Sequence, residues 1–224
     1  MTKLGTMKNY LIILVLNFIL LISCDSGKKS TKEIFLHNLN IKYLERKAFF
    51  GDELTNYLPK EITSKSITFT DAISADLGAL ELIVIDSISK DSIDYYQKKY
   101  ERISKKIYLA SDTCLLVIDR FLSNKKHYNT KEDYYFSPLI ERDCYNDKLP
   151  VPNFWHNDYT TDCTDCRLPK DFTLYVIDAK KGIMMKDIEL TDGWFMPDNW
   201  KNGYSKGVAL STERRIAIYW LNVW

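Results

Sequence analysis

One stretch of the chain gathers the side chains best suited to binding a metal. It contains Cys144, His156, Cys163 and Cys166, which are ligands of the kind that zinc takes in proteins. Their spacing lacks a second close pair, so zinc is the weaker interpretation. With the acidic residues nearby, residues 145–166 would also be the place for a hydrolase or metal-dependent enzyme, the alternative to a binding protein.

The same cysteines are candidates for disulfide bonds. Four thiols allow three pairings, and the sequence does not choose among them. The preferred pairing joins Cys163 and Cys166 to different partners, Cys144 and Cys114, which would pin a long irregular segment onto the rest of the fold. Cys114 opens a short apolar run and could instead be a buried thiol. The Cys163–Cys166 pair lies among Thr and Asp residues typical of a loop, which argues against redox chemistry at a helix start.

A glycine-rich and aromatic segment near the C-terminus is the candidate ligand site. Residues 193–207 hold three of the eight glycines in the chain. Aromatic rings beside amide and charged groups can cover the apolar face of a sugar and bond its hydroxyls. The alternative is that the rings fill the interior of their own loop. The candidate ligand-binding residues are Trp194, Asp198, Asn199, Trp200, Tyr204 and Lys206.

Known catalytic motifs are missing from the sequence. The three histidines, His37, His127 and His156, form no HExxH pattern, and no GxSxG, P-loop or GxGxxG sequence occurs. We therefore expect no cofactor and favour a noncatalytic protein.

The N-terminus resembles a bacterial lipoprotein signal. Lys3 and Lys8 precede an uncharged apolar run over residues 11–22, and Ser23 and Cys24 follow. Twelve residues are too few to cross a bilayer, which takes about 20. The resemblance implies cleavage after residue 23, lipid on the Cys24 sulfur and its new amino group, and a globular part that is periplasmic or surface-exposed on the cell envelope. An ordinary secretory signal is the alternative.

Composition bounds the rest of the chain. Without residues 1–23, which carry two lysines and no acid, 29 basic and 30 acidic residues remain. This balance gives no reason to expect nucleic acid binding. We predict a signal peptide over residues 1–23, a lipidated cysteine and polar tether over residues 24–33, and a single globular domain over residues 34–224.

Hydrophobic periodicity predicts an α+β fold with a mostly antiparallel sheet. The clearest element is one long amphipathic helix over about residues 91–107, with an apolar stripe opposite a charged face. Apolar or alternating runs predict strands at residues 66–70, 80–85 and 113–119. The second and third of these, with the helix between them, would form a parallel strand–helix–strand unit. A further helix is possible over residues 39–50, ending at Gly51.

The C-terminal third predicts two hairpins. One strand covers residues 172–177, turns over residues 178–182 with Gly182 at positive φ, and returns over residues 183–190. The other hairpin joins residues 208–210 to residues 216–224. Both faces of that last strand are apolar, which predicts a central or covered position. The long stretch between the halves, residues 122–171, lacks periodicity and is expected to be held by crosslinks.

The sequence thus predicts a membrane-anchored exported protein that binds a protein partner or an envelope glycan.

Overall fold

A computed structural model describes residues 30–74, 79–118, 142–154, 166–185, 188, 190, 192–193 and 196–224 of the 224-residue chain. The predicted signal peptide and residues 24–29 of the predicted tether lie outside this part. The chain divides into two compact units, residues 1–39 and residues 40–224. No helix in the described part is long and apolar enough to cross a membrane.

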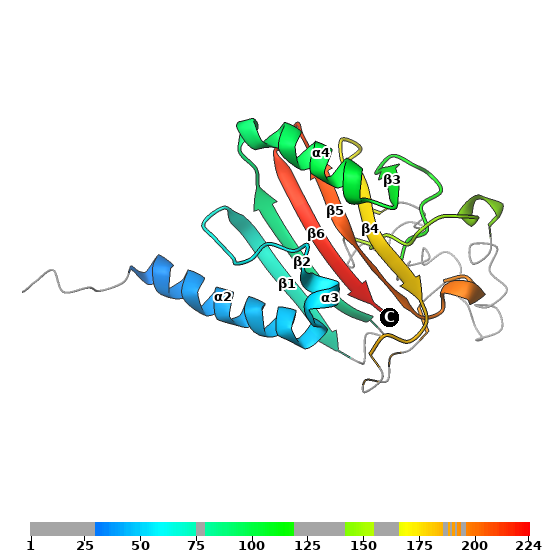
Figure 1. Cartoon of the computed structure of the whole chain (residues 1–224), viewed down its shortest axis with the longest axis horizontal. Coiled ribbons are helices and arrows are strands. Elements are labelled where there is room, and N and C mark those ends of the chain that lie inside the picture. The colour runs from blue at the N-terminus through cyan, green and yellow to red at the C-terminus, as the bar shows by residue number, and fades with distance from the viewer. Residues whose placement is uncertain are drawn as a thin grey trace, which may run out of the picture. The chain divides into compact units, whose positions relative to one another are not determined.

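A six-stranded sheet organises residues 40–224, and every pairing in it is antiparallel. The strand order is β1-β2-β6-β5-β4-β3 (Figure 1). The strands are β1 (Ser66–Ser74), β2 (Ala79–Ser87), β3 (Lys106–Leu109), β4 (Thr173–Lys181), β5 (Gly203–Ser211) and β6 (Ile216–Val223). The predicted α+β class and antiparallel sheet are confirmed.

The C-terminal strand β6 lies in the middle of the sheet, between β2 and β5. Trp220 and Leu221 point to opposite faces because side chains alternate along a strand, and both are fully buried. The prediction of a covered central strand is therefore confirmed. So is the second hairpin, in which the chain turns between Ser211 and Ile216 with Arg215 at φ 57°.

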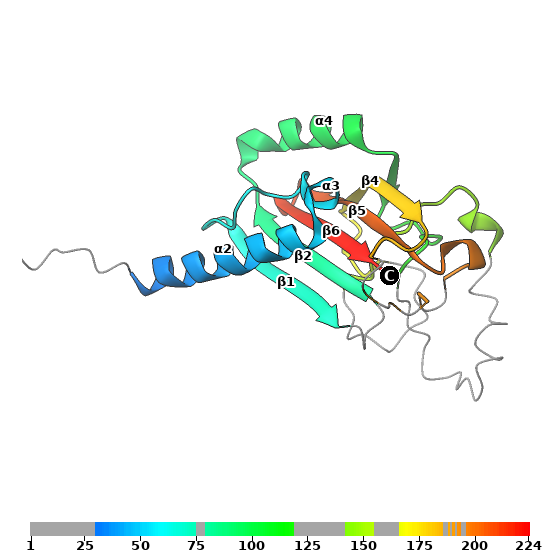
Figure 2. The ribbon, with the colours of Figure 1, turned by 60° about the horizontal axis from the view of Figure 1, so that its bottom comes forward.

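Helices cover one face of the sheet. The helix α4 (Ile93–Ile103) lies across the strands in both views (Figures 1 and 2). Its buried Tyr100 packs against Tyr219 of β6 and Tyr175 of β4, with ring centroids 6.4 Å and 6.1 Å away. The short helix α3 (Asp52–Thr55) reaches the same face, because Lys206 of β5 donates a hydrogen bond to the carbonyl of Glu53.

Irregular segments cover the opposite face. Leu115, Val117, Val151 and Phe172 pack with Trp220 in a buried cluster. Val117 and Val151 form a single parallel bridge, and Ile118 and Val151 exchange backbone hydrogen bonds with each other's segments. The core of the protein is thus two-sided, with helices on one face and long connections on the other.

The helix α2 (Thr31–Phe50) confirms the possible helix at residues 39–50 and starts earlier. It begins with a capping box, in which the Ser30 hydroxyl accepts a hydrogen bond from the N–H of Glu33 and the Glu33 carboxylate accepts one from the N–H of Ser30. It ends at Gly51, whose φ of 81° suits a residue without a side chain.

The long helix predicted over residues 91–107 is shorter than expected. A 3-10 turn, η2 (Lys90–Ser92), precedes α4, and the helix ends at Ile103 because Ser104 is extended, with φ −84° and ψ 138°. The N–H of Lys105 then donates to Val176, and residues 106–109 form β3. Ile107 continued the helical periodicity by coincidence, since it belongs to a strand.

The parallel strand–helix–strand unit was also wrong. The part of residues 113–119 that the structure describes, up to Ile118, forms no strand of the sheet, although Leu115–Ile118 are buried. Burial between the sheet and a second irregular segment gives the same continuous apolar run as a central strand. The strand after α4 is β3, and it lies at the far end of the sheet from β2.

The first predicted hairpin was wrong in its return strand. β4 continues through the expected turn as far as Lys181, with a bulge between Val176 and Asp178, and pairs with β5 instead of residues 183–190. Gly182 does have positive φ, 104°, as predicted. The described residues among 183–190 form no strand.

A candidate binding site beside strand β3

An open surface pocket of about 490 Å³ lies beside β3. One wall is β3 and the turn that follows it, and the other is the segment after the 3-10 turn η3 (Asp143–Tyr145). The lining residues are Lys106, Ile107, Tyr108, Leu109, Ser111, Asp112, Asn146, Asp147 and Lys148.

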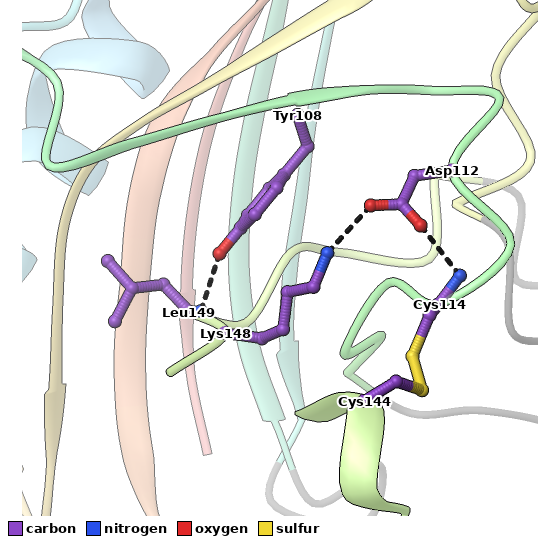
Figure 3. Close-up of polar contacts among 6 residues, drawn as sticks. All are labelled: Tyr108, Asp112, Cys114, Cys144, Lys148 and Leu149. Carbon is purple, nitrogen blue, oxygen red and sulfur yellow. Dashed lines mark hydrogen bonds and ion pairs between the residues drawn. A yellow bond between two sulfur atoms is a disulfide. The ribbon is translucent and has the colours of Figure 1, made fainter. Parts of the chain in front are cut away.

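Two polar contacts join the walls (Figure 3). The Lys148 ammonium donates to Asp112 Oδ2 at 2.7 Å and lies 4.8 Å from the centre of the Tyr108 ring. The Tyr108 hydroxyl accepts a 2.8 Å hydrogen bond from the N–H of Leu149. These contacts fix the position of Lys148 against β3 by charge, ring and backbone together.

Asp112 is also bound to its own turn. Its Oδ1 accepts a 2.8 Å hydrogen bond from the N–H of Cys114, which is an Asx turn that shapes the chain after β3. Partial burial alone would raise the pKa of Asp112, but the hydrogen bonds from Lys148 and Cys114 and the Lys148 charge outweigh it and lower that pKa. Asp112 is therefore ionised at neutral pH and keeps Lys148 in place.

A disulfide bond between Cys114 and Cys144 joins the same two segments (Figure 3). Their Cα atoms are 6.2 Å apart, a usual separation for a disulfide. This bond confirms that the segment is crosslinked but contradicts the preferred pairing of Cys114 and Cys144 with Cys163 and Cys166. The pairing follows from the fold, which places the turn after β3 next to η3, and sequence spacing carried no such information.

Strand β3 is an end strand of the sheet. The N–H of Ala110 donates to the carbonyl of Phe172, directly before β4, so the alternation of an antiparallel ladder turns the N–H groups of Ile107 and Leu109 toward the other edge. Within the described part of the chain, no strand pairs with that edge. The side chains of Ile107 and Leu109 are 46% and 58% exposed. An apolar strand edge therefore borders the pocket.

The predicted ligand residues lie elsewhere, and several serve internal contacts. Trp200 and Tyr204 are buried, and Trp200 packs on Trp224, whose indole N–H donates to the Trp200 carbonyl at 2.8 Å. The Tyr204 hydroxyl donates to Asp178 at 2.6 Å, and burial, followed by this hydrogen bond and the Asp178 charge, raises the pKa of Tyr204. These two rings fill the interior of the fold, although Tyr204 lies on strand β5 and not in a loop that fills its own interior, as the alternative supposed.

The remaining members of that set are divided. Asp198 and Asn199 are exposed in the 3-10 turn η4 (Asp198–Trp200), where Asp198 pairs with Lys201 at 3.1 Å. Lys206 is only 7% exposed and donates a 2.7 Å hydrogen bond to the carbonyl of Glu53. Trp194 lies outside the described residues. The described members are divided between the interior and the surface, and sugar binding by this set stays a prediction.

The candidate zinc ligands are only partly described. Cys144 is bonded to Cys114, which removes the thiolate that a zinc site would need, and Cys166 is buried in the core cluster. His156 and Cys163 lie outside the described residues. Among the residues that the structure does describe, no three His, Cys, Asp or Glu side chains are grouped to hold a metal ion.

Sequence reasoning did not select Tyr108, Asp112 or Lys148. Tyr108 lay directly after a predicted helix, and Lys148 lay in a stretch without periodicity. The usable signal was the spacing of Asp112 and Cys114. An aspartate can accept a hydrogen bond from the N–H two residues later, which forms an Asx turn, and Cys114 was already a disulfide candidate. Comparison with protein-family models, with curated proteins and with solved structures finds no match to this chain.

Proposed function

We propose that this protein is a lipid-anchored, noncatalytic binding protein of the cell envelope that takes an extended segment of a protein partner along strand β3. One observation carries the binding part, namely the edge of β3 with which no described strand pairs, where exposed Ile107 and Leu109 lie beside a pocket. The lipoprotein-like N-terminus ending at Cys24 supports the anchor and the envelope location.

The backbone of β3 supports strand addition. An unpaired edge offers N–H and C=O groups to an incoming strand, and main-chain hydrogen bonds then provide affinity that depends little on sequence. Natural edge strands usually avoid such pairing with charges, proline or a cover. Here Lys106 is the only charged residue of the strand, and two exposed apolar side chains follow it.

The pocket supports selectivity. A strand laid beside β3 directs alternate side chains toward the wall formed by Asn146, Asp147 and Lys148. The disulfide and the Asp112–Lys148 ion pair hold this wall before any partner arrives. Because little has to become ordered on binding, more of the contact energy is available for affinity.

The test begins with peptides selected from a random display library on the mature protein, followed by calorimetry with the enriched sequences. In the variant Ile107→Lys/Leu109→Lys we expect the dissociation constant to rise more than about tenfold, because two charges on the edge oppose pairing with another strand. The matched control is Ile183→Lys, a charge placed on another exposed apolar residue, and it should leave binding unchanged.

Equal binding by the wild type and the edge variant would contradict strand addition at β3. Binding of envelope glycan fragments with no selected peptide would favour the glycan alternative.

A further inference from the structure

The first turns of α2 carry exposed apolar side chains about ten residues after the predicted lipid attachment site. Ile34 is 49% exposed and Phe35 is 63% exposed. They belong to the unit formed by residues 1–39, and the described part of that unit begins at Ser30. Two large apolar side chains in succession on an exposed helical turn leave a patch that water solvates poorly.

The start of this helix is set locally. Ser30 and Glu33 form the reciprocal capping box, and the N–H of Ile34 donates to the Ser30 carbonyl at 3.1 Å. Both contacts lie within the first turn, so the helix begins at a fixed place along the chain without needing another part of the protein. Ile34 and Phe35 are therefore held in helical geometry a fixed number of residues after Cys24.

That distance is short. From Cys24 to Thr31 the chain spans at most about 25 Å when fully extended, and each helical residue then adds about 1.5 Å. A lipid on Cys24 would hold this turn close to the bilayer surface at all times. A short tether gives a high effective concentration, so a weak apolar contact is enough to be populated.

We propose that the first turns of α2 lie on the lipid surface, with Ile34 and Phe35 inserted into the headgroup layer. This inference rests on the anchor of the proposed function. Insertion of apolar helix residues at the interface adds to the hold of an acyl anchor. It would also fix the direction in which the chain leaves the membrane.

Hydrogen–deuterium exchange tests the contact on the lipidated full-length product reconstituted in vesicles of phosphatidylethanolamine and phosphatidylglycerol. In the variant Ile34→Ala/Phe35→Ala we expect the amides of residues 35–39 to exchange about tenfold faster than in the wild type, because the apolar area placed in the lipid is lost. Alanine has the highest helix propensity, so a weaker intrinsic helix cannot explain faster exchange. The matched control Ile183→Ala, at another exposed apolar residue, should change nothing.

Equal exchange in the wild type and the double variant would overturn the inference. Protection that disappears when the protein is diluted with excess lipid would also overturn it, because a second copy and not the bilayer would then cover the patch. Intact mass reports the lipid on Cys24 separately. An unmodified Cys24 overturns the anchor and this inference together, whereas fast exchange of residues 35–39 in the wild type with the lipid present overturns the inference alone.

Discussion

Lys148 and Lys206 have similar partners in very different surroundings. Each ammonium lies near a tyrosine ring, 4.8 Å from that of Tyr108 for Lys148 and 5.7 Å from that of Tyr57 for Lys206. Each also donates a 2.7 Å hydrogen bond, to the Asp112 carboxylate and to the Glu53 carbonyl respectively. The side chain of Lys148 is 22% exposed at an open pocket, whereas Lys206 is only 7% exposed beneath α3.

The two lysines have similar local contacts but differ in their access to solvent. Burial lowers the pKa of Lys206, and the charges of Asp178 and Glu53 only partly oppose this effect. The buried Lys206 ammonium can affect only the stability of the fold. The Lys148 ammonium at the pocket can contact a bound partner. Composition selected Lys206 as a ligand residue, but position favours Lys148.

The largest expected effect is on the pocket side, where a covalent bond holds the wall. Cys114→Ala/Cys144→Ala opens a loop whose ends are 30 residues apart, and we expect the free energy of unfolding to fall by about 3–4 kcal/mol. Urea denaturation measures this loss. A change below about 1 kcal/mol would show that packing alone holds the wall.

Next in size is the truncation of the buried lysine. Lys206→Ala removes a long buried stem and leaves the Glu53 carbonyl without this donor, so we expect a loss of about 2–4 kcal/mol in unfolding free energy. Lys206→Met keeps most of the stem and should recover part of that loss. If both variants were as stable as the wild type, Lys206 would not be a structural residue.

Lys148→Met should have the opposite profile. The ion pair with Asp112 is partly exposed, so its loss should cost less than about 1 kcal/mol of stability. Binding of a selected peptide should weaken measurably, because the pocket wall loses its charge and its link to Asp112. A large stability loss with unchanged binding would reverse the comparison between the two lysines.

The smallest effect concerns the two carboxylates, which are similarly exposed at 29% for Asp112 and 25% for Asp178. Hydrogen bonds and nearby lysine charges outweigh partial burial and lower the pKa of each in the folded protein. Their contribution to stability is therefore present above the unfolded pKa near 4 and is lost as the pH falls through the lowered folded values. Asp112→Asn and Asp178→Asn should each flatten the acid side of a stability–pH curve by a similar small amount. A change for only one of them would show that their surroundings differ.

The central strand could be predicted because both of its faces are apolar over its full length, a pattern that few other positions in an antiparallel sheet produce. The α+β class and the turn before β6 followed from the same reasoning. The end of α4 could not be predicted, since Ile107 fits both a helical stripe and an edge strand. The conformation of Leu115–Ile118 could not be predicted either, because a buried irregular segment and a buried strand have the same hydrophobic pattern.

The candidate site was less predictable than the fold. The cysteines identified a crosslinked segment, but not the Cys114–Cys144 pairing that brings Asp112 close to Lys148. Trp200 and Tyr204 drew attention by composition, yet large aromatics in a glycine-rich loop are also what a small protein needs to fill its interior. The decisive property, access to solvent, depends on contacts between segments far apart in the chain.

The position of β6 has a consequence for how the protein is made. Strand β6 is synthesised after the other five strands of the sheet, yet it is the strand that joins the β1–β2 pair to β5 and β4, since Leu80 pairs with Val223. Such long-range pairing is slow to form, and until it forms β2 exposes an edge that can pair wrongly. The sheet cannot close on a nascent chain that still lacks β6, so the β1–β2 pair has to wait for this strand before it can join the rest of the sheet.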